Sequence, residues 1–363
     1  MLHRRLSLIA PTLTLLTMCF ASSARAAISW TGLGTNDQFA NSGNYDGSFG
    51  SSTDLVFSDG SVRDEVNFNS SSNRDHNGSL TFSGDSFRFY NSQSGTFRHL
   101  GGDFTFNTAN TITVEGPFDM RRPLSGSGSG KLIMDNVRTQ NSNFTFGSAA
   151  TVIMNENRSS GFTGPNETRT VTLSDTVTVV ALQGAVGGNA GLNINAGATL
   201  AGMPTVTPGV VASTRDANLR TGGRLSPGDN YHTFADVGTM AFTFGDAAGR
   251  LNLEEGSLFT FDLDTPGTSD LVNITAGGLT LDGQEFGDFT FNALAGFGAG
   301  TYTLFDSVLT TGTLGANLSG TVGGLDATLS LSGNDVILTV IPEPASLVLM
   351  ALGTTLIASR RRG

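Results

Sequence analysis

The sequence predicts an all-β fold, a right-handed parallel β-helix or β-solenoid. Apolar residues recur at every second position, most often as a Phe-x-Phe triplet with threonine in the middle. This alternation places both rings on one face of a strand and the polar residue on the other. No stretch between residues 27 and 344 has a sustained apolar period of 3.6 residues, which argues against amphipathic helices. The 48 glycines suit many tight turns, and the 25 phenylalanines are enough to fill a core.

A second apolar pair follows several of these triplets at a fixed distance. Phe104-Thr-Phe is followed by Ile112 and Val114, with the turn-forming run Asn107-Thr-Ala-Asn110 between them. The pattern predicts two short strands joined by a corner, repeated as stacked coils with inward ladders. A β-sandwich gives the same alternation and is the alternative fold. The further instances are Phe144-Thr-Phe with Val152 and Met154, and Leu192-Asn-Ile194 with Leu200.

Two parts of the body can be separated in the sequence. Ile28-Ser-Trp30, followed by Asn44-Tyr45-Asp46, predicts a capping strand with aromatic cover at the start. A stretch rich in glycine and proline between Gly202 and Gly209 predicts a soft boundary. We therefore expect an N-terminal β-solenoid region over 27–203 and a C-terminal β-rich closing region over 204–340.

The N-terminal segment has the order of a secretory signal peptide. Met1 to Arg5 is basic, Leu6 to Phe20 is apolar, and Ala24 and Ala26 fit the small-x-small pattern that signal peptidase recognises. Residues 1–26 are therefore expected to be removed on export.

The segment 341–363 has three features in a fixed order. A rigid proline-rich run comes first, because proline lacks an amide donor and biases its preceding residue toward extended conformations. An uncharged 15-residue span follows, which as a helix covers roughly 22 Å of a hydrocarbon core about 30 Å thick. Terminal arginines then favour keeping that end in the cytoplasm. The features are Pro342, Glu343 and Pro344, the transmembrane span 345–359, and Arg360, Arg361 and Arg362.

This tail resembles the PEP-CTERM sorting signal of Gram-negative bacteria. The resemblance covers residues 341–363 only, and it implies recognition and cleavage by an exosortase-type membrane cysteine protease. It also implies an inner-membrane intermediate and a final place at the cell surface or outside the cell. The alternative is an ordinary C-terminal anchor with a chance Pro-Glu-Pro.

Ordered short phrases between residues 220 and 340 carry a second resemblance. They are similar to the closing segment of autotransporter-type β-strand-repeat proteins and of many PEP-CTERM passengers. The resemblance implies a passenger whose last coils cap the solenoid, and it carries over no catalytic residue. The phrases include Arg220–Asp229, Leu251–Leu258, Gly300–Asp306 and Asn334–Val340.

The body of the chain is strongly acidic. Six of the 20 basic residues lie in the two terminal segments, whereas all 31 acidic residues lie between 27 and 344, so the body carries a formal net charge of −17. Such a surface repels phosphate backbones and anionic lipid, which argues against nucleic acid as a partner. Cys19, the sole cysteine, leaves with the signal peptide, so disulfides, thiolate nucleophiles and cysteine zinc sites are not expected.

The sequence contains few patterns that indicate a catalytic or metal-binding site. His76, His99 and His232 lie far apart in the sequence and are expected to be solvated. Gly126-Ser-Gly-Ser-Gly-Lys131 departs from a phosphate loop on both sides and is expected to be a flexible turn. The calcium-binding repeat Gly-Gly-x-Gly-x-Asp is absent from the sequence.

Two carboxylate pairs, Glu254 with Glu255 and Asp262 with Asp264, are the remaining candidates. Asp262 and Asp264 share a strand face, where they could chelate calcium or act as the acid and base of a glycosidase. Solvent-facing positions on an outward strand face explain them as well. No catalytic, cofactor-binding or metal residue is therefore assigned.

These features predict an exported, non-enzymatic surface or matrix protein, sorted through its tail and associated with exopolysaccharide or adhesion. A β-helix enzyme acting on polysaccharide and a calcium-dependent adhesin are the alternatives. Enzymes of that kind collect Arg, Lys and Asp on one exposed sheet to hold an anionic sugar. A body with one lysine, Lys131, and a large negative charge is poorly suited to that task.

Overall fold

The computed structural model describes residues 27–342, apart from gaps at 62, 123, 140–143, 147–150, 155–170, 176–177, 182–184, 187–190, 207–215 and 229–236. The described part is nearly all β, which confirms the predicted class. Several predicted features lie outside the described residues, namely the signal-peptide positions Ala24 and Ala26, His232, and the tail from Glu343 through the span 345–359 to Arg360, Arg361 and Arg362.

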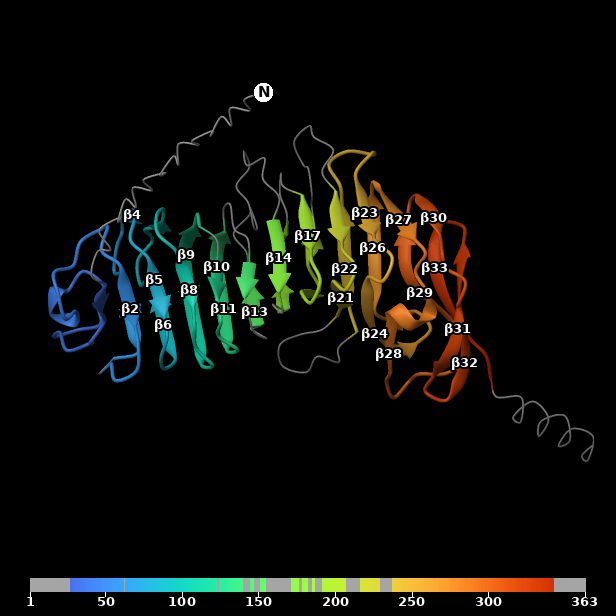
Figure 1. The fold of residues 1–363 in the computed structure, drawn as a ribbon, viewed down its shortest axis with the longest axis horizontal. Coiled ribbons are helices and arrows are strands. Elements are labelled where there is room, and N and C mark those ends of the chain that lie inside the picture. The colour runs from blue at the N-terminus through green and yellow to red at the C-terminus, as the bar shows by residue number, and fades with distance from the viewer. Residues whose placement is uncertain are drawn as a thin grey trace, which may run out of the picture.

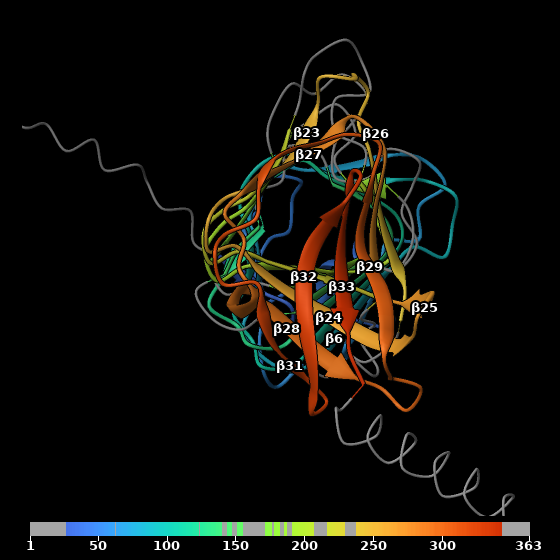
Figure 2. The same ribbon diagram turned by 90° about the vertical axis from the view of Figure 1, so that its right-hand side faces the viewer.

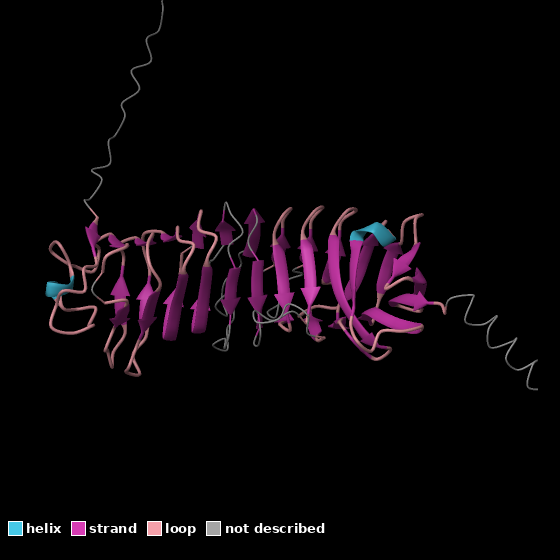
Figure 3. Ribbon diagram, turned by 90° about the horizontal axis from the view of Figure 1, so that it is seen from below, coloured by secondary structure: helices cyan, strands magenta, loops and turns pink. Residues whose placement is uncertain are grey.

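The strands stack side by side along an elongated body, with the N-terminal coils at one end and the C-terminal coils at the other (Figure 1). Figure 3 shows the same stack from below, with strands following one another along the long axis. The chain visits two sheets in turn in its first half and three from β16 (Ala185–Val186) onward, and most strands pair in parallel with the strand one turn later. This arrangement is consistent with a β-solenoid and differs from the antiparallel pairing of a β-sandwich.

The first sheet is parallel throughout and runs the length of the described body. Its strands, in spatial order, are β1 (Ile28–Ser29), β2 (Leu55–Phe57), β5 (Leu80–Phe82), β8 (Phe104–Phe106), β10 (Leu124–Gly126), β12 (Phe144–Phe146), β14 (Val171–Asp175), β17 (Leu192–Ile194), β20 (Ala217–Leu219), β23 (Arg250–Leu253), β27 (Gly278–Asp282) and β30 (Thr310–Thr313).

The second sheet has a main path and a branch. The main path contains β3 (Glu65–Asn67), β6 (Phe87–Tyr90), β9 (Thr111–Met120), β11 (Lys131–Thr139), β13 (Thr151–Met154), β15 (Thr178–Ala181), β18 (Thr199–Gly202), β21 (Arg224–Pro227), β24 (Leu258–Thr265) and β28 (Phe289–Ala293). Two strands branch from β9, β4 (Arg74–His76) and β7 (Phe97–His99), and β25 (Thr268–Ser269) folds back on β24.

The third sheet begins in the middle of the body. Its parallel strands are β16 (Ala185–Val186), β19 (Thr205–Val206), β22 (Thr239–Thr243), β26 (Leu271–Ala276) and β29 (Gly300–Ser307). Antiparallel strands β33 (Asp335–Val340), β32 (Leu325–Ser332) and β31 (Ser319–Val322) complete it. Two 3-10 helices, η1 (Ser42–Asn44) and η2 (Phe286–Asp288), occur among the described residues.

The core consists of inward columns formed by equivalent residues of successive coils. Phe57 pairs in register with Phe82, and their rings stack with centroids 4.9 Å apart. Phe104 pairs with Leu124 in the same sheet, and all four side chains are buried. Rings and aliphatic groups excluded from water in this way supply most of the favourable free energy of folding.

A short corner joins the first sheet to the second in the coils whose corners the structure describes. At the third corner position Gly222 has φ 74° and Gly256 has φ 73°, in the left-handed region that favours glycine. The corners stack, because the Gly222 amide donates to the Gly256 carbonyl at 2.8 Å. Pairing between β18 and β21 continues across the boundary expected between Gly202 and Gly209.

The N-terminal end is closed by aromatic residues. Trp30 forms an antiparallel bridge with Tyr45, and their rings meet edge to face with centroids 5.2 Å apart. The Trp30 indole donates to the Arg63 carbonyl at 2.9 Å, and the Tyr45 hydroxyl donates to the Phe39 carbonyl at 2.8 Å. These buried donors are satisfied, so the cap closes the first coils without leaving polar groups unpaired.

The C-terminal end is closed by the antiparallel strands β31, β32 and β33. Figure 2 views the molecule from this end and shows them in front of the coils. Leu329 pairs with Leu338 and both are buried, as are Val336 and Val340. The last strand therefore contributes its apolar face to the end of the core.

Candidate functional site

Strand β9 bends, and the bend creates two outer faces on the N-terminal coils. Its first half pairs with β6, from Phe87 opposite Ile112 onward. Its second half, beyond Gly116 and Pro117, pairs with β7, where Phe97 lies opposite Phe118. Strands β4 and β7 and the end of β9 thus form a face of their own.

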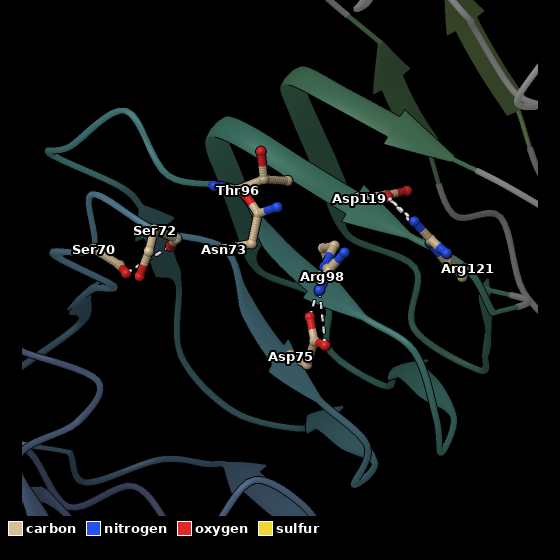
Figure 4. A network of polar contacts seen from close by, with 8 residues as sticks. All are labelled: Ser70, Ser72, Asn73, Asp75, Thr96, Arg98, Asp119 and Arg121. Carbon is tan, nitrogen blue, oxygen red and sulfur yellow. Dashed lines mark hydrogen bonds and ion pairs between the residues drawn. The ribbon is translucent and has the colours of Figure 1, made fainter.

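Ion pairs line this face (Figure 4), with Asp75 exposed and Asp119 buried. Arg98 of β7 donates to both carboxylate oxygens of Asp75 on β4, at 2.6 and 2.8 Å. Asp119 of β9 accepts from Nε and Nη2 of Arg121, at 3.1 and 2.9 Å. Arg98 lies in register with Asp119, so residues of alternating charge line up across neighbouring coils. We call Asp75, Arg98, Asp119 and Arg121 the charge ladder.

Loops rich in serine, threonine and asparagine border the charge ladder (Figure 4). The Ser70 hydroxyl donates to the Ser72 carbonyl at 2.7 Å, and the Thr96 amide donates to Oδ1 of Asn73 at 3.3 Å. These bonds fix the loops beside the ladder. Hydroxyl and amide groups of this kind can both donate and accept.

A second set of charges lies on the other side of the bend. Arg88 of β6 pairs with Glu65 at 3.1 Å and with Glu115 at 2.7 Å, and its guanidinium lies 4.6 Å from the ring centre of Tyr90. The hydrogen bond that Arg88 donates to the Glu115 carboxylate raises the pKa of Arg88 above its usual range. Burial, followed by the hydrogen bond to Asp37, raises the pKa of Tyr90 to about 12.

A cleft opens where this set meets the N-terminal cap. It is lined by Asn36, Asp37, Arg63, Asp64 and Glu65. The Arg63 guanidinium is held inward by the carbonyls of Gly32 and Gly34, at 2.8 and 2.7 Å. Two of the three carboxylates in this cleft also have partners, because Asp37 accepts from the Tyr90 hydroxyl and Glu65 pairs with Arg88.

The first sheet presents an uncharged outer row. Thr81 lies in register with Thr105, and Thr105 with Ser125. Further along, amide side chains bond to one another from coil to coil, since Asn252 donates to Asn218 and Asn218 to Asn193, each at 2.9 Å. Neighbouring strands lie about 4.8 Å apart, so these polar groups repeat at that interval along the body.

The histidine prediction was wrong. His76 and His99 were expected to be solvated, but they are 1% and 0% exposed and stack on each other with ring centroids 5.9 Å apart. Parallel pairing of β4 and β7 places them in one inward column, although 23 residues separate them. The rings are within 21° of parallel, so their in-plane nitrogen lone pairs do not converge on a shared metal position.

The solvent-facing assignment of Asp262 was also wrong. Asp262 is fully buried, and its Oδ1 accepts from Nδ2 of Asn292 at 2.7 Å. Strand β25 folds back over the end of β24 and removes this position from solvent. Asp264 remains half-buried and accepts from the Gly296 amide at 2.7 Å, so one carboxylate binds a side-chain amide and the other a backbone amide.

The other carboxylate pair lies at a corner between sheets. Glu254 pairs with Arg220, whose hydrogen bond lowers the pKa of that carboxyl. Glu255 is exposed beside it. The glycine-rich run before Lys131 is also a corner, since Gly126 ends β10 and Lys131 begins β11. It does not lead into the helix that a phosphate loop requires.

Charge is divided unevenly along the body. Between residues 63 and 138 there are eight basic and eight acidic residues, whereas residues 251–342 contain eleven acidic residues and no basic one. The net charge of the whole body is dominated by these C-terminal acidic residues and does not reveal the arginines of the N-terminal coils. The sequence feature that could have indicated these ion pairs is the spacing between residues of opposite charge, such as the 23 residues from Asp75 to Arg98.

Within the described ranges, no group of three or more His, Cys, Asp or Glu side chains is arranged to hold a metal ion. None of the helices in the described part of the chain has the length and apolarity that crossing a bilayer requires. No protein-family model, curated protein or solved structure matches this chain.

Proposed function

We propose that this chain is an exported, non-enzymatic surface or matrix protein, a right-handed solenoid delivered and processed through residues 341–363. The observation that carries the proposal is the position of Pro342. Strand β33 ends at Val340, and Ile341 and Pro342 are exposed directly after it. The Pro-Glu-Pro run therefore begins at the surface of the C-terminal cap, where a membrane protease can reach an extended substrate.

The right-handed coil belongs to the same proposal. Connections between parallel strands of one sheet are right-handed in about 98% of cases, because twisted strands return to their sheet most easily that way. The parallel pairings from β17 to β20 and from β18 to β21 support the assignment.

Exopolysaccharide is the partner that the outer faces favour. Within the charge ladder, Arg98 and Asp75 present a partly exposed guanidinium and carboxylate on neighbouring strands, and the first sheet adds hydroxyls and amides such as those of Thr105 and Asn218. Sugar hydroxyls donate and accept hydrogen bonds, so they match a surface with both kinds of group. The ends of the body are closed by caps, which favours lateral contact along the coils over end-to-end addition.

Intact-mass analysis of the protein recovered from envelope and medium tests the proposed processing. Secreted material should lack residues 1–26 and the membrane span 345–359, and deleting the processing protease should retain the tail on the protein. A full-length mass in secreted material, or a truncated mass that persists without the protease, would contradict the proposal.

A polysaccharide-active enzyme is the second candidate, and the cleft beside the N-terminal cap is the observation that favours it. Asp37, Asp64 and Glu65 line that cleft, and pairs of carboxylates are the usual acid and base of glycoside hydrolysis. Screening the purified protein against a panel of glycans decides between the two. Depolymerisation that is lost in Glu65→Gln would establish the enzyme.

A calcium-dependent adhesin is tested by chelation. Binding of a ligand to the folded state raises the melting temperature, so removing bound calcium with a chelator should lower it by several degrees. An unchanged melting temperature would remove this alternative.

A further inference from the structure

The two buried histidines have no function in the proposal above. His76 ends β4 and His99 ends β7, and the two residues are direct register partners. Both are essentially inaccessible to water, and none of their four ring nitrogens has a hydrogen-bond partner within the described part of the chain. Buried polar groups are almost always satisfied, so two adjacent exceptions require a physical explanation.

The surroundings of the pair are apolar. Phe39, from the N-terminal cap, meets His76 edge to face with ring centroids 6.0 Å apart, and Phe97 stacks on it at 6.1 Å. Phe104 meets His99 at 6.4 Å, and Met120 occupies the next position of the column. A charge on either imidazole would therefore lose its hydration, and only His76 would gain a compensating interaction, with the Ser79 backbone.

Charged groups near the pair do not compensate for this cost. Asp54 favours a charge on His76, whereas Arg122 opposes a charge on His99. The other charged residues on the packed strands alternate with the inward column and point outward, where Arg74 is exposed and the rest form ion pairs. Those pairs are Asp75 with Arg98 and Asp119 with Arg121.

The titration of the pair follows from this environment. Burial lowers the pKa of His76 to about 4, against smaller opposing effects of the Ser79 backbone and Asp54. Burial, the neighbouring His76 and Arg122 together lower the pKa of His99 to about 3. Each histidine stays neutral near pH 7, and a proton on one opposes a proton on the other.

We propose that the His76–His99 pair is an acid-sensitive latch that holds the N-terminal cap on the solenoid. Protonation places a cation in the column beneath Phe39, and the column separates to hydrate it. Separation releases Phe39, and with it the cap that carries Trp30 and Tyr45.

The solenoid architecture keeps this opening local. Coils contact their neighbours only, so a terminal coil can detach while later coils stay folded. The pair lies in the first coils, directly beneath the cap, whereas the C-terminal end is closed separately by β31, β32 and β33. Acid therefore opens one end of the body first.

The single tryptophan provides the measurement. Trp30 is 1% exposed and packs against Tyr45, so its emission reports on the cap. The full chain is titrated from pH 8 to pH 3 while Trp30 fluorescence and far-UV circular dichroism are recorded together. The expected result is a red shift of Trp30 between about pH 5 and pH 3, with most of the β signal retained.

Variants identify the group responsible. His99→Met continues the methionine of the next coil, and together with His76→Phe it removes both titrating rings, so the red shift should disappear or move down by at least about one pH unit. Asp103→Asn removes an exposed carboxylate from the same coils and should leave the midpoint unchanged. If the double variant lacks the β signal at pH 8, His99→Met alone provides the test through a shifted midpoint.

Three outcomes overturn the latch. One is a red shift with the same midpoint in the histidine variants, which would assign the transition to carboxylates. Another is simultaneous loss of the Trp30 and β signals in the unmodified chain, which would mean global acid unfolding. The third is a rise in melting temperature on adding Zn²⁺ that requires both histidines, which would make the pair a metal site.

Discussion

The carboxylate of Asp270 accepts a hydrogen bond from the backbone amide of Asp262 at 2.7 Å, and the Asp270 amide donates to the Asp262 carbonyl at 2.9 Å. Asp270 also accepts from the Gly238 amide at 2.8 Å, which ties β24 to the segment before β22. One buried side chain therefore joins three backbone segments of the later coils.

Asp270→Ala should destabilise these coils strongly. The substitution leaves the buried amide of Asp262 and the partly buried amide of Gly238 without their acceptor, and an unsatisfied buried donor costs roughly 1–3 kcal/mol. We expect the free energy of unfolding to fall by about 3 kcal/mol, measured by urea denaturation followed by circular dichroism. Asp306→Asn changes an exposed carboxylate of β29 and serves as the control. An equal effect of the two changes would show that Asp270 has no special role.

Gly256→Ala should weaken the stacked corners. Gly256 has φ 73°, which costs an L-residue roughly 1–2 kcal/mol, and the new Cβ would lie 3.3 Å from Cγ2 of Thr221. Gly287 has open space around its Cβ position and no left-handed φ, so Gly287→Ala is the matched control. The melting temperature should fall in the first variant and stay constant or rise slightly in the second. A corner that tolerates alanine without a lower melting temperature would contradict this account.

The alternating pattern was sufficient to predict the coils. Phe104 and Phe106 form β8 and point inward, and Ile112 and Val114 do the same in β9, as their spacing predicted. Period two fixes which side chains share a face, and the small residues between the pairs fix the corner. The fold class and the positions of the strands can therefore be predicted from the local sequence pattern.

Contacts between coils could not be derived in the same way, because the coil length is irregular. Register partners are separated by 20 residues between Phe104 and Leu124 but by 34 between Leu219 and Leu253. Without a constant period, the sequence does not show which residue lies above which. Asp75 and Arg98 were missed for this reason.

The burial of two individual residues, His99 and Asp262, was predicted wrongly. Phe97-Arg98-His99 alternates, so His99 shares the inward face of Phe97, but it was expected to be solvated because the histidines lie far apart in the sequence. Phe261-Asp262-Leu263 alternates too, and Asp262 was expected to face water. Strand β25 folds back on β24 and covers Asp262, and the alternation around Asp262 does not predict this hairpin.

Stability should depend on pH through the buried imidazoles. An unfolded histidine has a pKa near 6.5, whereas burial lowers the pKa of His76 to about 4 and the pKa of His99 to about 3 in the folded chain. Below pH 6.5 the unfolded state binds more protons than the folded state. The free energy of unfolding is therefore highest, as far as these histidines are concerned, above pH 6.5, and it decreases as the pH falls toward their folded pKa values. At pH 5 each histidine should lower the free energy of unfolding by roughly 2 kcal/mol.

Thermal melts at pH 7 and pH 5, followed by Trp30 fluorescence, measure this dependence. His99→Met should remove about half of the decrease in the free energy of unfolding that the two histidines cause at pH 5. Its melting temperature should therefore change less between the two pH values. Carboxylates titrate alike in both proteins and cancel in the comparison. Identical changes in the two proteins would show that His99 does not contribute.

Arg98→Ala should separate binding from stability at the charge ladder. The Arg98 and Asp75 side chains are 31% and 40% exposed, and exposed ion pairs contribute about 0–1 kcal/mol, so the melting temperature should change little. The guanidinium is nevertheless the forked donor of this face, and its loss should reduce retention on immobilised exopolysaccharide by roughly threefold or more. Arg220→Ala breaks a comparable exposed pair with Glu254 at a distant corner and is the matched control. Equal losses in both variants would indicate that net charge alone governs retention, whereas unchanged retention in Arg98→Ala would remove the charge ladder from the binding surface.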